Sequence, residues 1–208
     1  MRTHKSLEEI KLKKKRSRGV VRVTNLWREL PPGPNPPSHV YTIVEVPNGC
    51  SNKYEFDWKT GVFKLDRVLY SALYYPGDYG IIPRTWSIDE DPLDILVLTT
   101  KPTFTGCVMV VRPIGVLTTE DEHGEDDKIL GVPIGDPRFQ EVMDVGDVAK
   151  HLKAEIADFF LNYKKLEPKK WVKVKGWKDA KAVENIISSA IQLYKKKFKK
   201  PTADASSL

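Results

Sequence analysis

The chain has 208 residues, of which 40% are hydrophobic and 10% aromatic, a composition that suits one globular domain with its own core. No apolar stretch approaches 18 residues and none opens the chain, so we expect neither a membrane-spanning helix nor a secretory signal. The 34 basic and 28 acidic side chains give a net charge of +6, but residues 1–18 hold eight of the basic and two of the acidic groups.

The positive charge therefore belongs to an N-terminal tail, because the other 190 residues carry 26 groups of each sign. We predict a basic, flexible tail over residues 1–25, one folded domain over residues 26–198 and a flexible C-terminal tail over residues 199–208. Such tails are usually solvated extensions, and nucleic acid is only a weak alternative partner for this one. A transit peptide is poorly supported, because the tail is rich in lysine and contains Glu8 and Glu9.

Cys50 and Cys107 match neither a CxxC pair nor a zinc-ligand spacing. Two free thiols are typical of a protein in a reducing compartment. We therefore predict a cytoplasmic protein.

In the first two thirds of the chain, glycine and proline separate short apolar runs, a pattern typical of a β protein. Five prolines within residues 29–38 exclude a regular helix and predict an extended leading segment. Residues 39–46 form the first predicted strand, and Gly61 marks the turn of a hairpin made by residues 53–58 and 62–70. Further strands are predicted at 95–100, 106–117 (bent near Pro113) and 129–134. About seven short strands separated by glycine and proline predict a barrel.

The last third changes to a helical period. A first amphipathic helix carries Val148, Leu152, Ile156, Phe160 and Tyr163, with Asp147 as its N-cap. A second carries Val183, Ile186, Ile187, Ala190, Ile191 and Tyr194. A short strand, residues 171–177, is predicted between them.

The stretch DEDPLD, residues 89–94, gathers four carboxylates around Pro92. Proline favours an extended conformation for the residue before it, and side chains two apart in an extended chain face the same way. We therefore expect Asp89 and Asp91 to project together, with Asp94 joining them at the mouth of the next strand. Converging carboxylates suit Mg²⁺, Mn²⁺ or Ca²⁺, although an acidic loop alone is more often a solvated turn.

A calcium loop of the EF-hand type does not fit, since Leu93, Asp94 and Thr100 occupy its diagnostic fifth, sixth and twelfth positions. A second acidic loop, residues 119–128, follows another predicted strand and can meet the first at one rim of the barrel. Its His123 has no partner histidine at ligand spacing, so an exposed loop residue is the simpler interpretation.

Basic and phenolic side chains accompany the acids. Lys53 and Glu55 are two apart in a predicted strand and therefore share a face, and Arg67 lies across the same hairpin. For each basic residue alone, a surface charge is the better interpretation, and for each of the tyrosines Tyr54, Tyr75, Tyr79 and Tyr163 ordinary packing explains the residue at least as well as a site does.

Taken together, these motifs resemble the soluble inorganic pyrophosphatases of the first family. DEDPLD matches the family's D-x-D-P-x-D signature, and NKYEFD, LDRVLY, YPGDYGIIP, FFLNYKKLE and WVKVKGW occur in the family's order. The resemblance covers residues 26–197 and implies an α+β fold. The implied fold is an OB-like closed β-barrel of about five core strands, with additional hairpin strands and two C-terminal helices packed on it. A homo-oligomer is also implied, with a hexamer favoured over a dimer.

The resemblance implies hydrolysis of inorganic pyrophosphate to two orthophosphates and assigns roles at matching positions. Asp91 would accept the proton of a metal-activated water, and Tyr75 would shape the pocket. The implied metal ligands are Asp89, Asp94, Asp121, Asp126, Glu45 and Glu55. The implied phosphate ligands are Lys53, Arg67, Tyr79, Lys128, Tyr163 and Lys164. The implied cofactor is Mg²⁺, as several ions, with Mn²⁺, Zn²⁺ or Co²⁺ as substitutes and Ca²⁺ as an inhibitor.

A charge count agrees with a metal requirement. The seven carboxylates and four cations of this set sum to −3, which would repel a tetra-anionic substrate, and two divalent ions change the sum to +1. Two other classes of function stay open. A nucleic-acid-binding OB barrel would use the basic tail as an arm, but the body is neutral with clustered acids. A metal-dependent nucleotidase would need an aromatic or apolar slot for a base, which the sequence does not identify.

Overall fold

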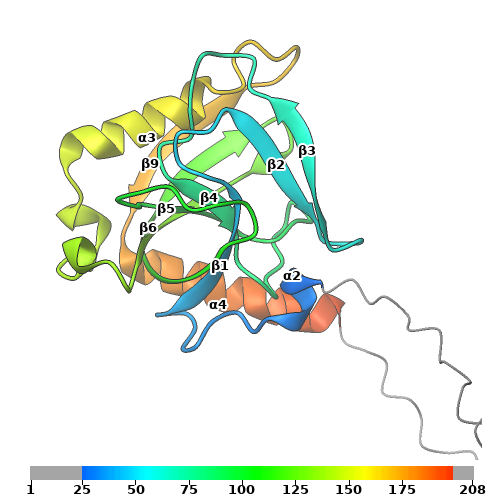
Figure 1. The fold of residues 1–208 in the computed structure, drawn as a ribbon, viewed down its shortest axis with the longest axis vertical. Coiled ribbons are helices and arrows are strands. Elements are labelled where there is room, and N and C mark those ends of the chain that lie inside the picture. Colours follow the sequence, from blue (N-terminus) through cyan, green and yellow to red (C-terminus); the bar gives the residue numbers. More distant parts are fainter. Residues whose placement is uncertain (1–24, 199–208) are drawn as a thin grey trace, which may run out of the picture.

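A closed five-stranded β-barrel forms the centre of the molecule, as seen in a computed structural model that describes residues 25–198 (Figure 1). The strands of the ring are β1 (Val40–Val46), β4 (Asp78–Ile81), β5 (Asp94–Val97), β8 (Lys128–Pro133) and β6 (Val108–Asp121). They pair in that order, and β6 pairs back with β1, which closes the ring. The predicted OB-like barrel is therefore confirmed. Apart from Asn25, both predicted tails lie outside the described residues.

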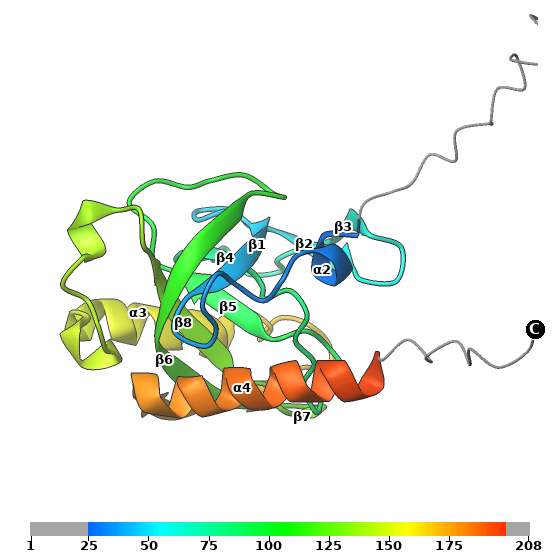
Figure 2. The same ribbon diagram turned by 90° about the horizontal axis from the view of Figure 1, so that it is seen from below.

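Further strands and helices surround the ring. They are β2 (Asn52–Asp57), β3 (Val62–Val68), β7 (Gly124–Glu125), β9 (Val172–Lys178), α2 (Leu26–Glu29), α3 (Lys150–Asn162), α4 (Ala180–Lys197) and the 3₁₀ turns η1 (Pro137–Phe139) and η2 (Val145–Asp147). β2 and β3 form the predicted hairpin, and β9 pairs with the far half of β6. Figure 2 shows α4 running along one side of the barrel.

The apolar faces of the two long helices complete the core. α4 buries Val183 and Ile187 against the barrel residue Ile95. α3 buries Phe160 in the cluster that contains Tyr79, with ring centroids 6.1 Å apart. Full burial of such a side chain stabilises the fold by roughly 1.5–3 kcal/mol. Tyr79, a predicted site residue, is thus fixed by core packing.

Two local predictions were wrong. Asp147 does not cap α3, because it lies in η2 and forms a capping box with Asp144, and α3 begins only at Lys150. The second acidic segment, residues 119–128, is not an irregular loop, because β6 continues to Asp121 and pairs with β7. This extension places Asp121 on a strand.

The leading segment is part of the folded body. Trp27 in α2 is fully buried, and the Arg84 guanidinium donates to the carbonyl oxygens of Arg28 and Glu29 at 3.0 Å each. Cys50 and Cys107 are free and half-buried, as predicted. None of the helices within residues 25–198 combines the length and apolar character needed to cross a bilayer.

Gly80 allows β4 to pass close to β1, and this close approach can be tested. A Cβ atom at Gly80 would stand 2.0 Å from the carbonyl oxygen of Ile43, a backbone atom that cannot turn aside. We expect Gly80→Ala to destabilise the metal-free protein by about 3 kcal/mol or more, measured by urea unfolding. Gly135→Ala is the matched control, because a Cβ there meets no atom within 4 Å. Equal losses in both variants would contradict the argument.

Candidate active site

Two clefts meet at Asp94, the first residue of β5. The larger cleft, of about 530 Å³, lies beside the β2–β3 hairpin and is also lined by Glu45, Lys53, Glu55, Tyr79 and Asp91. The smaller, of about 300 Å³, lies against α4 and is also lined by Asp89, Asp126 and Asp127. Because Asp94 lines both, we treat them as one candidate site.

The acidic loop between β4 and β5 does not run extended as predicted. Glu90 adopts a left-handed φ of +66°, and the backbone N–H of Asp91 donates to Asp89 Oδ1 at 3.3 Å. This turn places Asp89 in the cleft against α4 and Asp91 in the cleft beside the hairpin. The prediction that the two project together was therefore wrong, whereas Asp94 reaches both clefts.

Crowding raises the pKa of several carboxyl groups. Loss of hydration, and then the charge of Asp94, raise the pKa of Asp89 and of Asp91 to about 6. Both residues are solvent-exposed, but the neighbouring carboxylates disfavour their ionised forms, as does the partial loss of hydration in the clefts. Burial raises the pKa of Glu45 to about 8, although the Phe56 N–H donates to its Oε1 at 2.7 Å. Ionisation of these carboxyl groups is therefore unfavourable in the folded protein, and nearby cations would favour their charged forms.

Buried lysines offset part of this charge. Lys128 Nζ lies 2.5 Å from Asp94 Oδ2 and also pairs with Asp126. Burial alone would lower the pKa of Lys128, but the two carboxylates outweigh it and raise that pKa well above its usual value. Lys164 Nζ lies 2.7 Å from Asp121 Oδ2. Burial alone would raise the pKa of Asp121, and the bond from Lys164 lowers it below its usual value instead.

Glu167 was not among the predicted site residues. Its buried side chain accepts a hydrogen bond from Arg67 Nε at 2.8 Å, across 100 positions of sequence. Arg67 Nη1 pairs with Asp66, whereas Nη2 is buried without a hydrogen-bond partner among the described residues. A buried N–H without an acceptor is costly, and phosphate oxygens are strong acceptors for guanidinium groups. Glu167 thus holds Arg67 with one donor nitrogen left for an anion.

Three buried tyrosines lie together behind the acidic residues. Tyr75 and Tyr79 have ring centroids 5.2 Å apart, and Lys128 Nζ lies 6.0 Å from the Tyr79 centroid. Tyr163 packs on Phe160 of the same core cluster. Burial raises the pKa of all three phenols, so each is a neutral hydroxyl that can donate to an anion.

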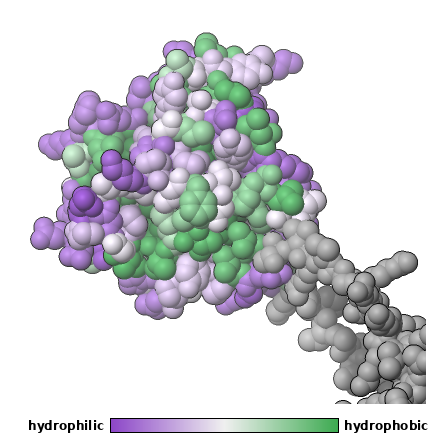
Figure 3. Space-filling view, viewed as in Figure 1, coloured by the Kyte–Doolittle hydropathy of each residue, from purple (hydrophilic) through white to green (hydrophobic). Residues whose placement is uncertain are grey.

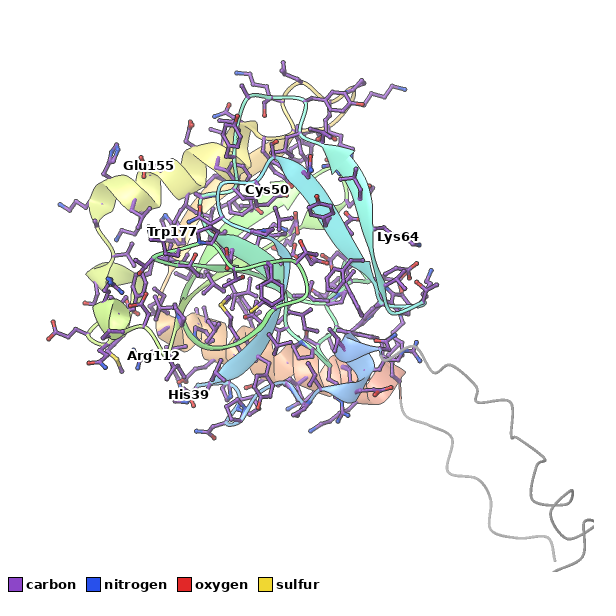
Figure 4. The ribbon with its side chains drawn as sticks, in the orientation of Figure 1. His39, Cys50, Lys64, Arg112, Glu155 and Trp177 are labelled. Carbon is purple, nitrogen blue, oxygen red and sulfur yellow. The ribbon has the colours of Figure 1, made fainter. Side chains whose placement is uncertain are left out.

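The predicted site residues are brought together in part. Lys53 pairs with Glu55 on the hairpin, as expected from their shared face. Six of the predicted site residues line neither of the two clefts, namely Arg67, Tyr75, Asp121, Lys128, Tyr163 and Lys164. Within residues 25–198, no three His, Cys, Asp or Glu side chains are arranged about one metal position. Lys128 bridges the predicted ligands Asp94 and Asp126, and Lys164 pairs with Asp121. Figure 4 shows other charged residues, Arg112 and Glu155, on the opposite side of the barrel from Lys64 of the hairpin.

Comparison with known proteins gives a consistent picture. The family model described as inorganic pyrophosphatase matches residues 42–195. The inorganic pyrophosphatase of Thermus thermophilus is 49% identical over 170 residues, 81% of this chain and 97% of the relative. That of Haloferax volcanii is 43% identical over 176 residues, 85% of this chain and 99% of the relative. A crystal structure of the Thermus thermophilus enzyme superposes with a TM-score of 0.80, covering 83% of this chain and 99% of that chain.

The buried carboxyl group of Glu45 predicts a pH-dependent stability. Its pKa is about 8 in the folded protein against 4.5 for an unperturbed glutamate, so the folded state binds the proton more tightly. Between pH 4.5 and about 8 the unfolded chain loses this proton while the folded protein keeps it, so the free energy of unfolding falls as the pH rises. Gln keeps the acceptor for the Phe56 N–H and cannot ionise. In EDTA, Glu45→Gln should be more stable than wild type by about 3 kcal/mol at pH 7 and by little at pH 4.

Urea unfolding at both pH values measures this difference, with Glu155→Gln as the control because Glu155 is exposed on α3. A stability gain of the same size at pH 4 and pH 7 would show that Glu45 does not titrate in this range.

Proposed function

The chain belongs to the inorganic pyrophosphatase family, and we propose that it hydrolyses inorganic pyrophosphate to two orthophosphates with a divalent metal. The observation that carries the proposal is the meeting of carboxylates and buried cations at Asp94. Cations of this kind suit phosphate groups, and carboxylates suit the divalent ions that accompany them.

The metal ligands are assigned to the carboxylates that line the two clefts, namely Asp89, Asp94, Asp126, Glu45 and Glu55, and to Asp121, which pairs with Lys164. All are oxygen donors, which suits a hard cation such as Mg²⁺. The family resemblance adds Mn²⁺, Zn²⁺ or Co²⁺ as substitutes and Ca²⁺ as an inhibitor. The raised pKa values of Glu45, Asp89 and Asp91 support this assignment, because loss of hydration and then the charge of Asp94 disfavour the ionised carboxylates, and a bound cation would favour them. When bound, the ions would neutralise phosphate charge and lower the pKa of the attacking water.

The phosphate groups are assigned to the half-buried cations Lys53 and Arg67 and to the buried Lys128, Lys164, Tyr79 and Tyr163. Arg67 has the strongest support, because its Nη2 is a buried donor without an acceptor among the described residues and Glu167 fixes its orientation. Tyr75 packs on Tyr79 and shapes the floor of the site.

Asp91 is the proposed proton acceptor. A pKa of about 6 leaves it mainly ionised at pH 7, yet basic enough to take a proton. Asp89 has a similar pKa but faces α4, so position and not basicity distinguishes the two. Asp91 faces the larger cleft, together with Lys53.

Self-association and a cytoplasmic location complete the proposal, with a hexamer favoured over a dimer. Exposed apolar side chains support association, since such surface is commonly buried between subunits. Tyr70, Tyr74 and Phe104 are 60%, 60% and 67% exposed. Figure 3 shows hydrophobic patches among the hydrophilic groups of one face.

Phosphate release from pyrophosphate, with Mg²⁺ and with excess EDTA, tests the proposed function. We expect rapid release with Mg²⁺ and none above background in EDTA, because the carboxylates alone would repel the substrate. ATP is the comparison substrate, since Trp58 gives the larger cleft one aromatic wall. Faster release from ATP would favour a nucleotidase, and substantial turnover in EDTA would contradict the metal requirement.

Replacing Asp91 by asparagine tests its role as the base. Asn preserves size and polarity but cannot accept the proton, so Asp91→Asn should lower kcat by roughly 10²–10⁴-fold. The thermal midpoint should not fall, because an unfavourable charge is removed. Asp158→Asn, an exposed position on α3, is the control and should keep wild-type turnover. Near-normal turnover of Asp91→Asn would remove Asp91 from the mechanism.

A further inference from the structure

The acidic loop, residues 87–91, is closed by its own backbone. Ser87 N–H donates to the carbonyl oxygen of Asp91 at 2.8 Å, and Glu90 N–H donates to that of Ser87 at 3.3 Å. Glu90 has a left-handed φ of +66°, which residues with a Cβ atom rarely adopt unless the surrounding structure favours it. A turn of this kind therefore depends on contacts from outside the loop.

Helix α4 contacts the loop at two points. The N–H of Trp86, which precedes the loop, donates to the carbonyl oxygen of Ala190 at 3.1 Å. Lys197 Nζ donates to Glu90 Oε1 at 2.7 Å, across 107 positions of sequence. Ala190 and Lys197 are seven residues apart in α4, so they lie on one face of the helix, about 10 Å apart along its axis. Lys197 lies beyond residues 42–195, the part of the chain that the family model matches. The loop is thus held at its start and at the residue with the left-handed φ.

A buried aromatic ring locates the Lys197 ammonium. Lys197 Nζ lies 4.3 Å from the centroid of the Trp86 ring, which is within the range of a cation–π interaction. Trp86 is 4% exposed, and its ring makes edge-to-face contacts with Trp58 and Phe198 at centroid distances of 5.0 Å each. Because this packing fixes the ring, the ammonium beside it is placed more closely than that of a free surface lysine.

The ion pair itself is open to solvent. The side chains of Lys197 and Glu90 are 42% and 76% exposed, and pairs of this kind contribute little to the stability of a fold. Their geometry still bears on the site, because Glu90 stands between Asp89, which lines the cleft against α4, and Asp91, which lines the larger cleft. A restraint on Glu90 therefore restrains the direction of both neighbouring carboxylates.

We propose that Lys197 is a positioning residue for the acidic loop, through its contacts with Glu90 and the Trp86 ring. Held in this way, the loop presents Asp89 to the cleft against α4 and Asp91 to the larger cleft. The inference rests on the proposed function, in which Asp89 is a metal ligand and Asp91 accepts the proton.

Lys197→Met tests this role, because methionine keeps an unbranched apolar side chain beside the Trp86 ring and removes the charge. We expect the Mg²⁺ concentration that gives half-maximal turnover to rise about threefold, the size of effect that one exposed ion pair supports. Loss of positive charge alone would act in the opposite direction, because a site with one cation fewer attracts Mg²⁺ more strongly. A fall in this concentration, or no change, would overturn the inference.

Two further variants of the same helix end serve as controls. Lys196→Met is the matched control, since Lys196 is exposed on the same turn of α4 and makes no ion pair within residues 25–198. It should not raise the Mg²⁺ requirement. Lys197→Arg keeps a cation that can pair with Glu90 and lie against an aromatic ring, so it should have close to the wild-type requirement. A threefold rise in either variant would contradict the proposed role of the Lys197 charge.

The Glu90→Gln background decides whether the effect passes through Glu90. If it does, adding Lys197→Met to Glu90→Gln should change the Mg²⁺ requirement by less than about 1.5-fold, because residues in contact are not additive. The full threefold rise in that background would show that Lys197 acts elsewhere and would overturn the inference.

Amide hydrogen exchange in the metal-free protein gives a readout without turnover. The Ser87 N–H closes the loop, so its exchange rate reports how often the loop opens. Exchange of this amide should be about threefold faster in Lys197→Met, in line with the loss of one exposed ion pair, and unchanged in Lys196→Met. Equal rates in wild type and Lys197→Met would overturn the inference, whereas a wild-type protein that releases no phosphate would contradict only the proposed function.

Discussion

Repulsion among carboxylates is the interaction on which the rest of the site depends. Asp94 is the shared neighbour, and its charge contributes to the raised pKa values of Glu45, Asp89 and Asp91. In a medium of low polarity, like charges a few ångströms apart repel by several kcal/mol, so the fold must hold these groups against their own field. Lys128 provides the local compensation, since it is buried and pairs with both Asp94 and Asp126. A divalent ion would act in the same sense with twice the charge.

The barrel supplies the rigidity that this arrangement needs. Asp94 is followed directly by Ile95 and Lys128 by Ile129, and both isoleucines are fully buried. β5 and β8 run parallel with Ile95 opposite Ile129, so the two charged residues begin adjacent strands at the same end of the barrel. Their pairing follows from strand register and not from loop conformation. The position of Asp121 is also fixed by the sheet, because it is the last residue of β6 and pairs with Val172 of β9.

The parts of this architecture that local patterns determine could be predicted from the sequence. Alternation placed Lys53 and Glu55 on one face of a strand, and the helical period identified the buried face of α4. The predictions that were wrong, and the site residue that was missed, depended on backbone conformations or tertiary contacts that no local sequence pattern indicates. The left-handed φ of Glu90 separates Asp89 from Asp91, although an extended chain would have aligned them. Glu167 was missed because tertiary packing alone brings it to Arg67, 100 positions away in the sequence.

The two ends of the described chain pack together beside the larger cleft, where the ring centroids of Trp27 and Phe198 are 5.1 Å apart. Trp27 and Phe198 both lie outside the residues matched by the family model, yet both contact Trp58 and Trp86. Asp89 and Asp91 have similar pKa values, so the different roles proposed for them would come from the direction in which the loop presents each side chain. The loop is held at its start, where Trp86 N–H donates to the Ala190 carbonyl oxygen and Ser87 N–H to that of Asp91. Residues at the two ends of the described chain therefore pack around Trp86, which lines the cleft against α4 and precedes the acidic loop.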